Sequence, residues 1–537
     1  MTLFNETLNG KDSTNISVNM NGQSNLGGAS KAEAIQGWLI DKLAEVLEIE
    51  PNQIDVGQDF EEYGLESAEA INLSGDLEDY LGCRLPPTLL WDYQNIEALA
   101  QYLAQYSANG NLPAAQNGSP ELQLSSDLDS DYELNIPPEN YQFAEFPEYK
   151  KLLAQQEQVK SLGNGNPFFV PQEGIVNDRT TINGRELINF ATYNYIGMCG
   201  DPLVTQAAQE ATEQYGTSAC ASRLISGEKP LHRELEQELA DFIGVEDSIV
   251  LVGGHATNVT TIGHLFGKGD LVIYDALSHN SILQGCFLSG ASLMAFPHND
   301  VDALEKILSD RRHRYQRVLI VIEGVYSTDG DVANLPPVIA LKQKYKTFLM
   351  VDEAHSIGAI GKTGRGISEY YDIDPNDIDL WMGTLSKSFA SCGGYIAGSK
   401  ALVEYLKYTA PGFVFSVGMS PPNAGATLAA VRVLKAEPER ATTLQARAKL
   451  FLDLAKEKDL DTGMSQDSPV IPIIVGDSLK SIQLSQNLFK RGINVPFMIY
   501  PSVPQNGARL RFFITCNHTE AQIQSTIEIL TEELNKL

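Results

Sequence analysis

One lysine in this sequence stands where it could act as a nucleophile. Lys387 lies in the run GTLSKSF at residues 383–389, between an apolar run at 379–382 and a second apolar segment at 393–398. A lysine in such a setting is rarely buried unless it is paired or functional. It can lose its charge and attack an aldehyde as a neutral amine, which is the chemistry of a pyridoxal phosphate Schiff base. This run alone is equally compatible with a loop lysine at the end of a strand.

A carboxylate ends another apolar run. Asp352 closes the segment TFLMVD at residues 347–352, so we expect its side chain to be buried. A buried carboxylate needs a cationic or hydrogen-bonded partner. A protonated pyridine nitrogen is such a partner, and this ion pair keeps the ring an electron sink. A structural pairing with an arginine is the alternative.

Three more polar segments follow apolar runs. The segment GGHATN at residues 253–258 opens a helix, where small residues and free N–H groups suit a phosphate. His279 follows the next run and could stack on a cofactor ring or be an ordinary loop histidine. The segment EGVYSTDG at residues 323–330 follows a third run. Each segment by itself is weak, because a simple strand–helix turn explains it.

Alternating strands and helices must position these groups. The apolar runs at 248–252, 271–274, 318–322 and 347–351 are candidate strands, with helical stretches such as 230–243 and 300–309 between them. This alternation predicts an α/β domain with a mostly parallel sheet. Sites in such sheets lie beyond the carboxyl ends of strands, which is where the polar residues fall.

The N-terminal part of the chain has a different character. Residues 1–30 are rich in Asn, Ser and Gly and are predicted to be disordered. Residues 31–107 carry apolar side chains at helical spacing, together with sixteen acidic and three basic residues. They predict a small acidic helical bundle. Residues 108–140 are predicted to be a flexible acidic linker, and a large domain follows at 141–537.

Bulk composition excludes several classes of partner. The chain has 537 residues, enough for several domains, and its net charge of −30 makes nucleic acid and anionic membranes poor partners. The six cysteines form no CxxC pair, which argues against a disulfide framework or a metal site and suits the cytoplasm. We expect no signal peptide, because the first residues include neither a basic n-region nor an apolar h-region. We expect no membrane span, because no apolar run reaches about 18 residues.

Taken together and in this order, the polar segments resemble the α-oxoamine synthases, a branch of the fold type I pyridoxal phosphate enzymes. The resemblance covers residues 141–537 and includes serine palmitoyltransferases and 8-amino-7-oxononanoate synthases. It implies a fold type I transferase with a mostly parallel sheet. The matching segments are 189–197 (NFATYNYIG), 222–227 (SRLISG), 277–279 (LSH), 323–327 (EGVYS), 352–355 (DEAH), 383–387 (GTLSK) and 508–511 (ARLR).

The resemblance implies a role for each cofactor-binding residue. Lys387 forms the internal aldimine and later removes the Cα proton, while Asp352 pairs with the pyridine nitrogen. His279 stacks on the ring, and His355 and Ser327 lie near the phenolic oxygen. The phosphate is held by Thr384, Ser386 and the amides of Gly254, His255 and Ala256.

The resemblance also implies how substrates bind. Arg511 binds the amino acid carboxylate, a task suited to a bidentate guanidinium. Tyr193 and Asn194 lie near the substrate. Ser416 belongs to a segment, residues 413–422, that completes the site of a second subunit, so a homodimer is implied.

Ser67 stands where a glycine-containing loop turns into a helix. Its hydroxyl could simply cap that helix, or it could carry a phosphate ester, which a helix N-terminus favours. The segment GLESA at residues 64–68 resembles the acyl carrier protein motif, with Glu66 where Asp is usual. The resemblance implies a four-helix bundle with 4′-phosphopantetheine on Ser67, attached by a phosphopantetheinyl transferase.

These resemblances imply a decarboxylative condensation. A small amino acid (serine, glycine or alanine) would react with an acyl thioester to give an α-amino ketone, CO₂ and a free thiol, in lipid or polyketide metabolism. The fusion suggests that the acyl group arrives on the carrier rather than on coenzyme A. Two alternatives stay open: an aminotransferase or aldol-type enzyme of the same fold, and a carrier fused to an inactive domain.

Overall fold

The computed structural model describes residues 28–47, 49–63, 65, 67–81, 85, 89–104, 136–161, 166–500 and 502–537. The predicted disorder at 1–27 and the predicted linker at 108–135 lie outside these residues. Contacts divide the chain into two units, residues 1–65 with 89–123, and residues 66–88 with 124–537. Each unit is described by itself. In the described parts of the chain, no helix is both long and apolar enough to cross a membrane.

The first unit contains a pair of packed helices. Helix α1 (Gly28–Leu47) packs against α4 (Ile96–Ala104), and the short helix α3 (Leu89–Asp92) precedes α4. Helix α1 begins inside the segment that was predicted to be disordered up to residue 30. Most of the apolar positions at helical spacing are buried, among them Ile35, Leu39, Leu43, Leu99 and Leu103. Trp38, Val46 and Leu47, which were predicted on the same face as Ile35, are half-buried. The 3-10 turns η1 (Pro51–Gln53) and η2 (Phe60–Tyr63) connect the helices.

Helix α2 (Ser67–Leu81) belongs to the second unit and starts at Ser67. Leu73 and Leu77 on this helix are buried, as their spacing predicts. Tyr80, which was expected on the same apolar face, is 46% exposed. A tyrosine can leave its polar hydroxyl in water while its ring covers apolar surface, so helical spacing alone overstates its burial.

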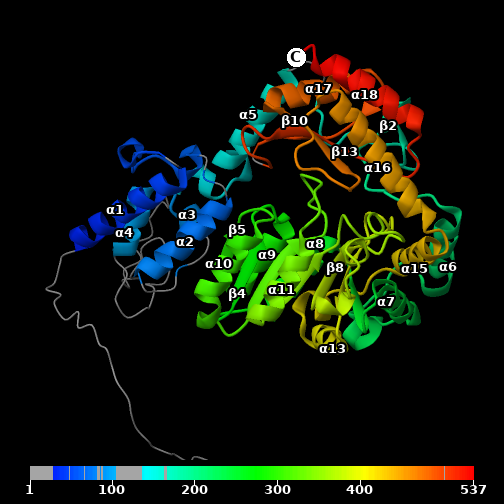
Figure 1. The fold of residues 1–537 in the computed structure, drawn as a ribbon, viewed down its shortest axis with the longest axis horizontal. Coiled ribbons are helices and arrows are strands. Elements are labelled where there is room, and N and C mark those ends of the chain that lie inside the picture. The colour runs from blue at the N-terminus through cyan, green and yellow to red at the C-terminus, as the bar shows by residue number, and fades with distance from the viewer. Residues whose placement is uncertain are drawn as a thin grey trace, which may run out of the picture. The chain divides into compact units, whose positions relative to one another are not determined.

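A seven-stranded sheet forms the centre of the second unit (Figure 1). Its order is β3-β9-β8-β7-β6-β4-β5. All neighbours are parallel except β9, which runs antiparallel to β3 and β8, because the segment 385–393 is too short for a crossover. The sheet is therefore mixed but mostly parallel. The strands are β3 (Asp247–Leu251), β4 (Leu271–Asp275), β5 (Ser292–Phe296), β6 (Val318–Glu323), β7 (Phe348–Asp352), β8 (Leu380–Thr384) and β9 (Gly394–Gly398).

Helices cover both faces of this sheet, which explains why its strands are apolar throughout rather than alternating. One face packs against α8 (Gly254–Leu265), α9 (Asn280–Ser289) and α13 (Lys400–Thr409). The other packs against α7 (Pro230–Ile243), α10 (Val301–Arg311) and α11 (Leu335–Tyr345). The predicted strands and helices are confirmed within two residues at each end, whereas β5 was not predicted.

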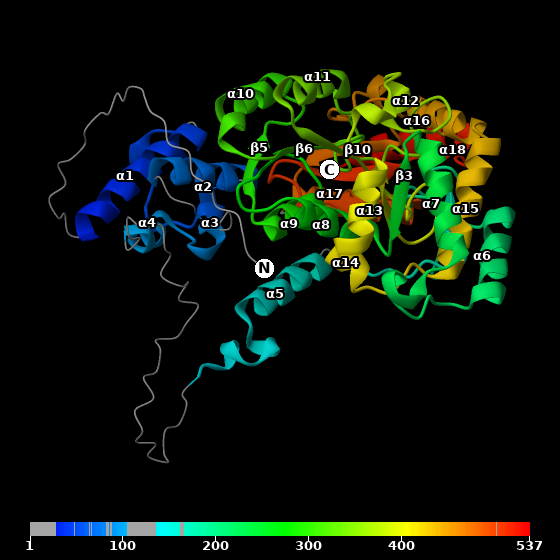
Figure 2. The same ribbon diagram turned by 90° about the horizontal axis from the view of Figure 1, so that it is seen from below.

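Two further helices continue the layer that α7 begins (Figure 2). Helix α15 (Pro421–Ala436) packs against α7, and α6 (Pro202–Tyr215) packs against α15. Gly425 permits their close approach, since a Cβ there would lie 2.7 Å from the carbonyl oxygen of Ala207.

Two small sheets and three helices are built from the C-terminal part of the chain together with residues 179–189. The antiparallel sheet β10-β13-β12 carries Arg511 on its central strand. The second sheet has the order β1-β2-β11. Their elements are β1 (Arg179–Ile182), β2 (Arg185–Asn189), α16 (Glu439–Glu457), β10 (Val470–Gly476), α17 (Ser478–Lys490), β11 (Ile493–Asn494), β12 (Phe497–Met498), β13 (Ala508–Phe513) and α18 (Glu520–Leu534). Shorter pieces are α5 (Pro147–Ser161), α12 (Ile367–Tyr370), α14 (Pro411–Val414), the π-helix η5 (Arg223–Gly227) and the 3-10 turns η3 (Pro138–Asn140), η4 (Phe143–Glu145), η6 (Arg312–Arg314) and η7 (Pro375–Asp377).

Candidate active site

A cavity of about 300 Å³ opens beyond the carboxyl ends of β6, β7 and β8. It brings together most of the residues that the sequence singled out. A larger cavity of about 560 Å³ lies by β2, β11 and α17 and contains none of them, so size alone does not identify the site. The smaller cavity is lined by Tyr193, Gly254, His255, Asn258, His279, Ser281, Glu323, Ser327, Asp352, Ala354, His355, Met382, Thr384, Ser386, Lys387 and Arg511.

Lys387 follows β8 in the short connection to β9. Its Nζ lies 2.8 Å from His355 Nε2 and 5.6 Å from the centre of the Tyr193 ring. Burial lowers the pKa of Lys387 to about 8, although the carboxylates of Asp352 and Glu323 act in the opposite direction. The amine is therefore partly neutral at mildly alkaline pH, as a nucleophile toward an aldehyde requires.

Asp352 ends β7 and is 3% exposed, which confirms the burial expected from the sequence. Its Oδ2 accepts a hydrogen bond from Asn258 Nδ2 at 2.8 Å, and its Oδ1 accepts one from the Ala354 N–H at 2.9 Å. Neither donor carries a charge. Within the described residues Asp352 forms no ion pair with an arginine, so its carboxylate can serve a cation in the cavity.

The start of α8 forms a cradle for an anion. The first N–H groups of any helix lack intrahelical partners. Gly253, which precedes α8, has no side chain that could cap them. A Cβ at Gly254 would lie 2.6 Å from Thr384 Oγ1, so glycine lets the helix start and the Thr384 hydroxyl lie side by side. With Ser386 on the same cavity wall, these donors fit a phosphate group.

His279 is held at the start of α9. Its Nδ1 accepts a hydrogen bond from the Ser281 N–H at 3.2 Å and lies 2.7 Å from Ser281 Oγ. The backbone N–H of His279 donates to Glu323 Oε1 at 2.5 Å. Burial lowers the pKa of His279. The imidazole, which lies on the cavity wall, is therefore uncharged at neutral pH and suited to stack on a cofactor ring.

Glu323 faces Asp352 across the parallel pair β6–β7. Burial, followed by the nearby Asp352 carboxylate, raises the pKa of Glu323 well above its usual range. Burial therefore favours the protonated form of Glu323 at this position beside Asp352.

His355 connects Lys387 to a buried tyrosine. Its Nδ1 lies 2.7 Å from the Tyr195 hydroxyl, while its Nε2 faces Lys387 Nζ. Burial, followed by the charge of Lys387, lowers the pKa of His355 well below its usual range. The imidazole is therefore neutral.

Arg511 brings a cation to the same cavity from β13. Its Nη1 donates to the carbonyl oxygen of Ser327 at 2.7 Å, and its Nη2 donates to the Tyr193 hydroxyl at 3.4 Å. In the part of the chain that the structure describes, its buried Nε has no hydrogen-bond partner and the guanidinium forms no ion pair. Arg511 can therefore receive a substrate carboxylate.

Four predicted residues do not line the cavity. Ala256 lies in the first turn of α8, where only its amide bears on the anion cradle. Asn194 is buried, and its Oδ1 accepts from the Cys199 N–H at 3.0 Å. Ser416 is half-buried between α14 and α15. Ser67 is the first residue of α2.

Four polar residues in or next to the site were given no individual role from the sequence: Tyr195, Asn258, Ser281 and Glu323. Asn258 donates both to Asp352 and to Ser281 Oγ, the latter at 2.8 Å. The one available signal was a polar residue inside an otherwise buried helix or strand, since Asn258 and Glu323 are both buried.

Two family models match the chain. Aminotransferase class I and II matches residues 185–530, and phosphopantetheine attachment site matches residues 37–103.

Relatives and solved structures agree with the first match. The 8-amino-7-oxononanoate synthase of Symbiobacterium thermophilum is 40% identical over 349 residues, covering 65% of this chain and 88% of that protein. The structure of SPT with a PLP internal aldimine is similar with a TM-score of 0.70 and 31% identity, covering 72% of this chain and 98% of that chain. Serine palmitoyltransferase of Sphingomonas wittichii is similar with a TM-score of 0.70 and 30% identity, covering 73% and 98%. The chain therefore belongs to the aminotransferase class I and II family and is an α-oxoamine synthase, a pyridoxal phosphate-dependent acyltransferase of fold type I with a fused phosphopantetheine carrier domain.

Proposed function

We propose that this protein condenses a small amino acid (serine, glycine or alanine) with an acyl thioester carried on its own phosphopantetheine arm, releasing CO₂ and the free thiol. The observation that carries this proposal is the occurrence, in one chain, of a phosphopantetheine attachment domain and an α-oxoamine synthase domain. Carrier fusion raises the effective concentration of the acyl donor at the site.

The lining residues support the amino acid half of this reaction. Arg511 binds and orients the carboxylate, because its guanidinium has a donor to spare at the cavity. Tyr193 lies beside both Arg511 and Lys387 and limits the space for the side chain. Lys387, whose pKa is lowered to about 8, takes the proton from Cα as a neutral amine.

The bound pyridoxal phosphate supplies an electron sink for the carbanion at Cα. Asp352 would pair with the protonated pyridine nitrogen, whose positive charge makes this sink effective. The first turn of α8, with Thr384 and Ser386, binds the phosphate, and His279 covers the ring. His355 and Ser327 lie on the same wall and serve the phenolic oxygen.

The thioester half of the reaction follows from carbonyl chemistry. The carbanion forms the new carbon–carbon bond at the thioester carbonyl, and the carbon–sulfur bond breaks to release the pantetheine thiol. Loss of CO₂ from the resulting β-keto acid and return of one proton to Cα give the α-amino ketone. Ser67, modified by a phosphopantetheinyl transferase, is the residue that presents the acyl group.

A second subunit completes the site in this proposal. Phe415 is 87% exposed, and Val417 and Ile225 are also exposed although all three are large and apolar. Such a group of exposed apolar side chains suits an interface. A homodimer that includes Ser416 in this interface, working in the cytoplasm, is the assembly we expect.

Full-length protein, phosphopantetheinylated and loaded with an acyl group, tests the proposal directly. Each common amino acid is added separately, and CO₂ and product mass are measured. We expect CO₂ and an α-amino ketone with serine, glycine or alanine. Absence of CO₂ with every amino acid and acyl chain would overturn the condensation. A keto acid formed from the amino acid without CO₂ would instead identify an aminotransferase.

A further inference from the structure

Tyr195, His355 and Lys387 form a continuous chain of polar contacts inside the protein. The Tyr195 hydroxyl lies 2.7 Å from His355 Nδ1, and His355 Nε2 lies 2.8 Å from Lys387 Nζ. Tyr195 is not part of the cavity wall, so it contacts neither cofactor nor substrate and can act only through His355.

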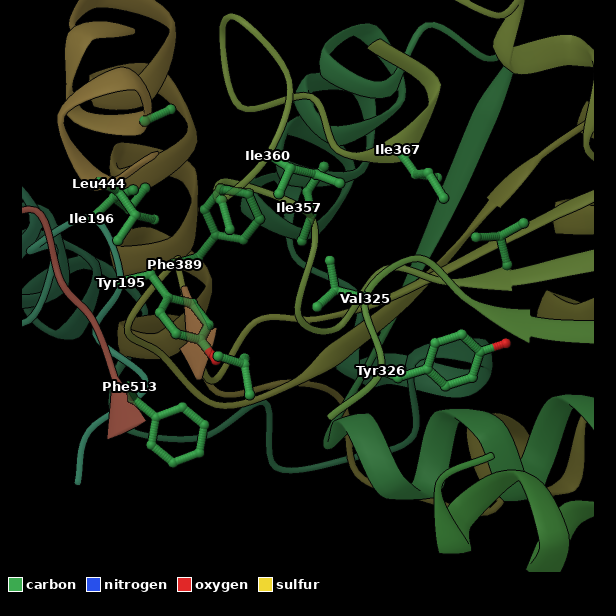
Figure 3. Packing of buried hydrophobic residues seen from close by; sticks show 14 of the residues in the cluster. Tyr195, Ile196, Val325, Tyr326, Ile357, Ile360, Ile367, Phe389, Leu444 and Phe513 are labelled. Carbon is green, nitrogen blue, oxygen red and sulfur yellow. The ribbon is translucent and has the colours of Figure 1, made fainter. Parts of the chain in front are cut away.

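The surroundings of Tyr195 keep water from its hydroxyl. The residue is 0% exposed and belongs to the main apolar core. Figure 3 shows its ring with Ile196, Phe389 and Phe513 around it, and the centres of the Tyr195 and Phe513 rings are 6.4 Å apart. Burial raises the pKa of Tyr195 well above its usual range, so the hydroxyl keeps its proton. It therefore remains a group that both donates and accepts hydrogen bonds.

Neutral imidazole has one donating and one accepting nitrogen. When Lys387 is an ammonium group it can only donate, so His355 Nε2 must accept and Nδ1–H must donate to the Tyr195 oxygen. When Lys387 is a neutral amine, Nε2–H can donate to its lone pair, and Nδ1 then accepts from the Tyr195 O–H. A hydroxyl is the group that satisfies both arrangements by rotating.

We propose that Tyr195 is a positioning residue that lets His355 change tautomer in step with the proton on Lys387. Each protonation state of the lysine is then matched by a fully hydrogen-bonded His355. No atom is oxidised or reduced, and one proton is lost overall. Lys387 gives a proton to His355 Nε2, and the transient imidazolium releases its Nδ1 proton to solvent when the buried contact with Tyr195 opens. This inference concerns the lysine itself and does not rest on the proposed condensation.

Several other groups act on Lys387. Asp352 and Glu323 favour its ammonium form, whereas burial and the charge of Arg511 favour the neutral amine. His279 and the ring of Tyr193 complete the polar and aromatic surroundings of the Lys387–His355 pair. None of these groups replaces the Tyr195 hydroxyl as the hydrogen-bond partner of His355 Nδ1, because among the described residues the contact at that nitrogen is with Tyr195, whereas Lys387 lies at Nε2.

The Tyr195→Phe variant removes this partner. The tautomer with Nδ1–H then carries a buried donor without an acceptor, which is costly. His355 shifts to the Nε2–H tautomer, which pairs with a neutral amine and not with an ammonium group. The pKa of Lys387 should therefore fall in this variant.

The measurement is the rate at which full-length protein, stripped of its cofactor, forms the Schiff base with added pyridoxal phosphate, followed by absorbance from pH 6 to 10. The neutral amine is the reacting form, so the rate rises through the pKa of Lys387. We expect the midpoint of the Tyr195→Phe variant to lie about one unit below that of the parent protein. The Tyr371→Phe variant, which loses a hydrogen bond of 3.0 Å to the Ala333 carbonyl outside the cavity, should keep the parent midpoint.

The His355→Gln background separates a positioning role from a packing effect. If Tyr195 acts through His355, the Tyr195→Phe change should produce no further shift of the midpoint in this background. An unshifted midpoint in the single variant, or an equal shift in both backgrounds, overturns the proposal.

A second measurement follows His355 in the unsubstituted protein, again stripped of its cofactor, and uses a variant only to assign one signal. The sequence has 8 histidines, so ¹⁵N-histidine labelling gives few signals, and the His355→Gln spectrum identifies the one from His355. We expect the proton of His355 to move from Nδ1 to Nε2 as the pH rises through the midpoint measured for Lys387. A tautomer that does not change across that midpoint overturns the proposal.

Discussion

At the scale of single residues, position at a strand end predicted the ionisable side chains of the site but not the side chains that form hydrogen bonds with them. Lys387, Asp352 and His355 follow apolar runs, and runs of that kind can be read directly from the sequence. Tyr195 lies 160 positions from its partner His355, and Asn258 lies 94 from Asp352. Pairings over such distances depend on the tertiary fold, and no local pattern specifies them.

Asp352→Asn should impair the enzyme more than substitutions at neighbouring residues that leave the Asp352 carboxylate in place. Asparagine still accepts the Ala354 N–H but leaves a pyridine cation without a counter-charge. We expect kcat/KM for the condensation to fall by about 10²–10⁴-fold, because removing one partner of a buried pair costs about 3–5 kcal/mol. Asp459→Asn, at an exposed position, is the matched control and should leave kcat/KM unchanged. A fall of less than threefold in Asp352→Asn would show that the carboxylate does not serve the cofactor.

At the scale of elements, the parallel strands and their helices were predictable because burial on both faces makes each strand a continuous apolar run. Strand β5 was missed since its run SLMAF at 292–296 carries no polar residue of interest at its end. The side-chain contacts that connect the loops at the strand ends could not be predicted from the sequence either. His298 lies 2.8 Å from Asp275 and 2.9 Å from Asp331, and so joins the loops after β4, β5 and β6.

His298→Gln should destabilise the protein in a way that depends on pH. Burial by itself would lower the pKa of His298, but the carboxylates of Asp275 and Asp331 outweigh it and raise that pKa to about 10. A pKa raised above the unfolded value of about 6.5 means that the stabilisation is fully present below pH 6.5 and is lost as the pH rises through about 10. We expect a loss of about 3 kcal/mol in the free energy of unfolding at pH 6.

Urea unfolding of the full chain at pH 6, 8 and 10 measures this loss. The difference between parent and variant should shrink by at least half between pH 6 and pH 10. His313→Gln, at an exposed histidine of η6, provides the control and should show little difference at any pH. A difference for His298→Gln that stays constant over this range would mean that packing, rather than the charge of His298, joins the three loops.

At the scale of the whole molecule, composition separated the acidic N-terminal part from the α/β part, and the two family matches fall on these parts at 37–103 and 185–530. The identity of the acyl donor follows from neither part alone. The proposed donor, an acyl group on Ser67, rests on the presence of both domains in one chain. Exchanging loaded chains between variants is therefore the decisive approach.

Ser67→Ala should keep the absorbance of the lysine-bound cofactor and lose the turnover that depends on self-presented acyl groups. Ser67 is not among the residues that line the cavity around Lys387, so cofactor binding should be unaffected. Adding acyl-loaded Lys387→Ala protein, which has a carrier but no reactive lysine, should restore product. The rate should rise with its concentration, because presentation between chains lacks the effective concentration that a tether provides. If unloaded Ser67→Ala protein instead turns over acyl-coenzyme A as fast as the loaded parent protein turns over its own acyl group, the carrier is not the source of the acyl chain and coenzyme A takes its place.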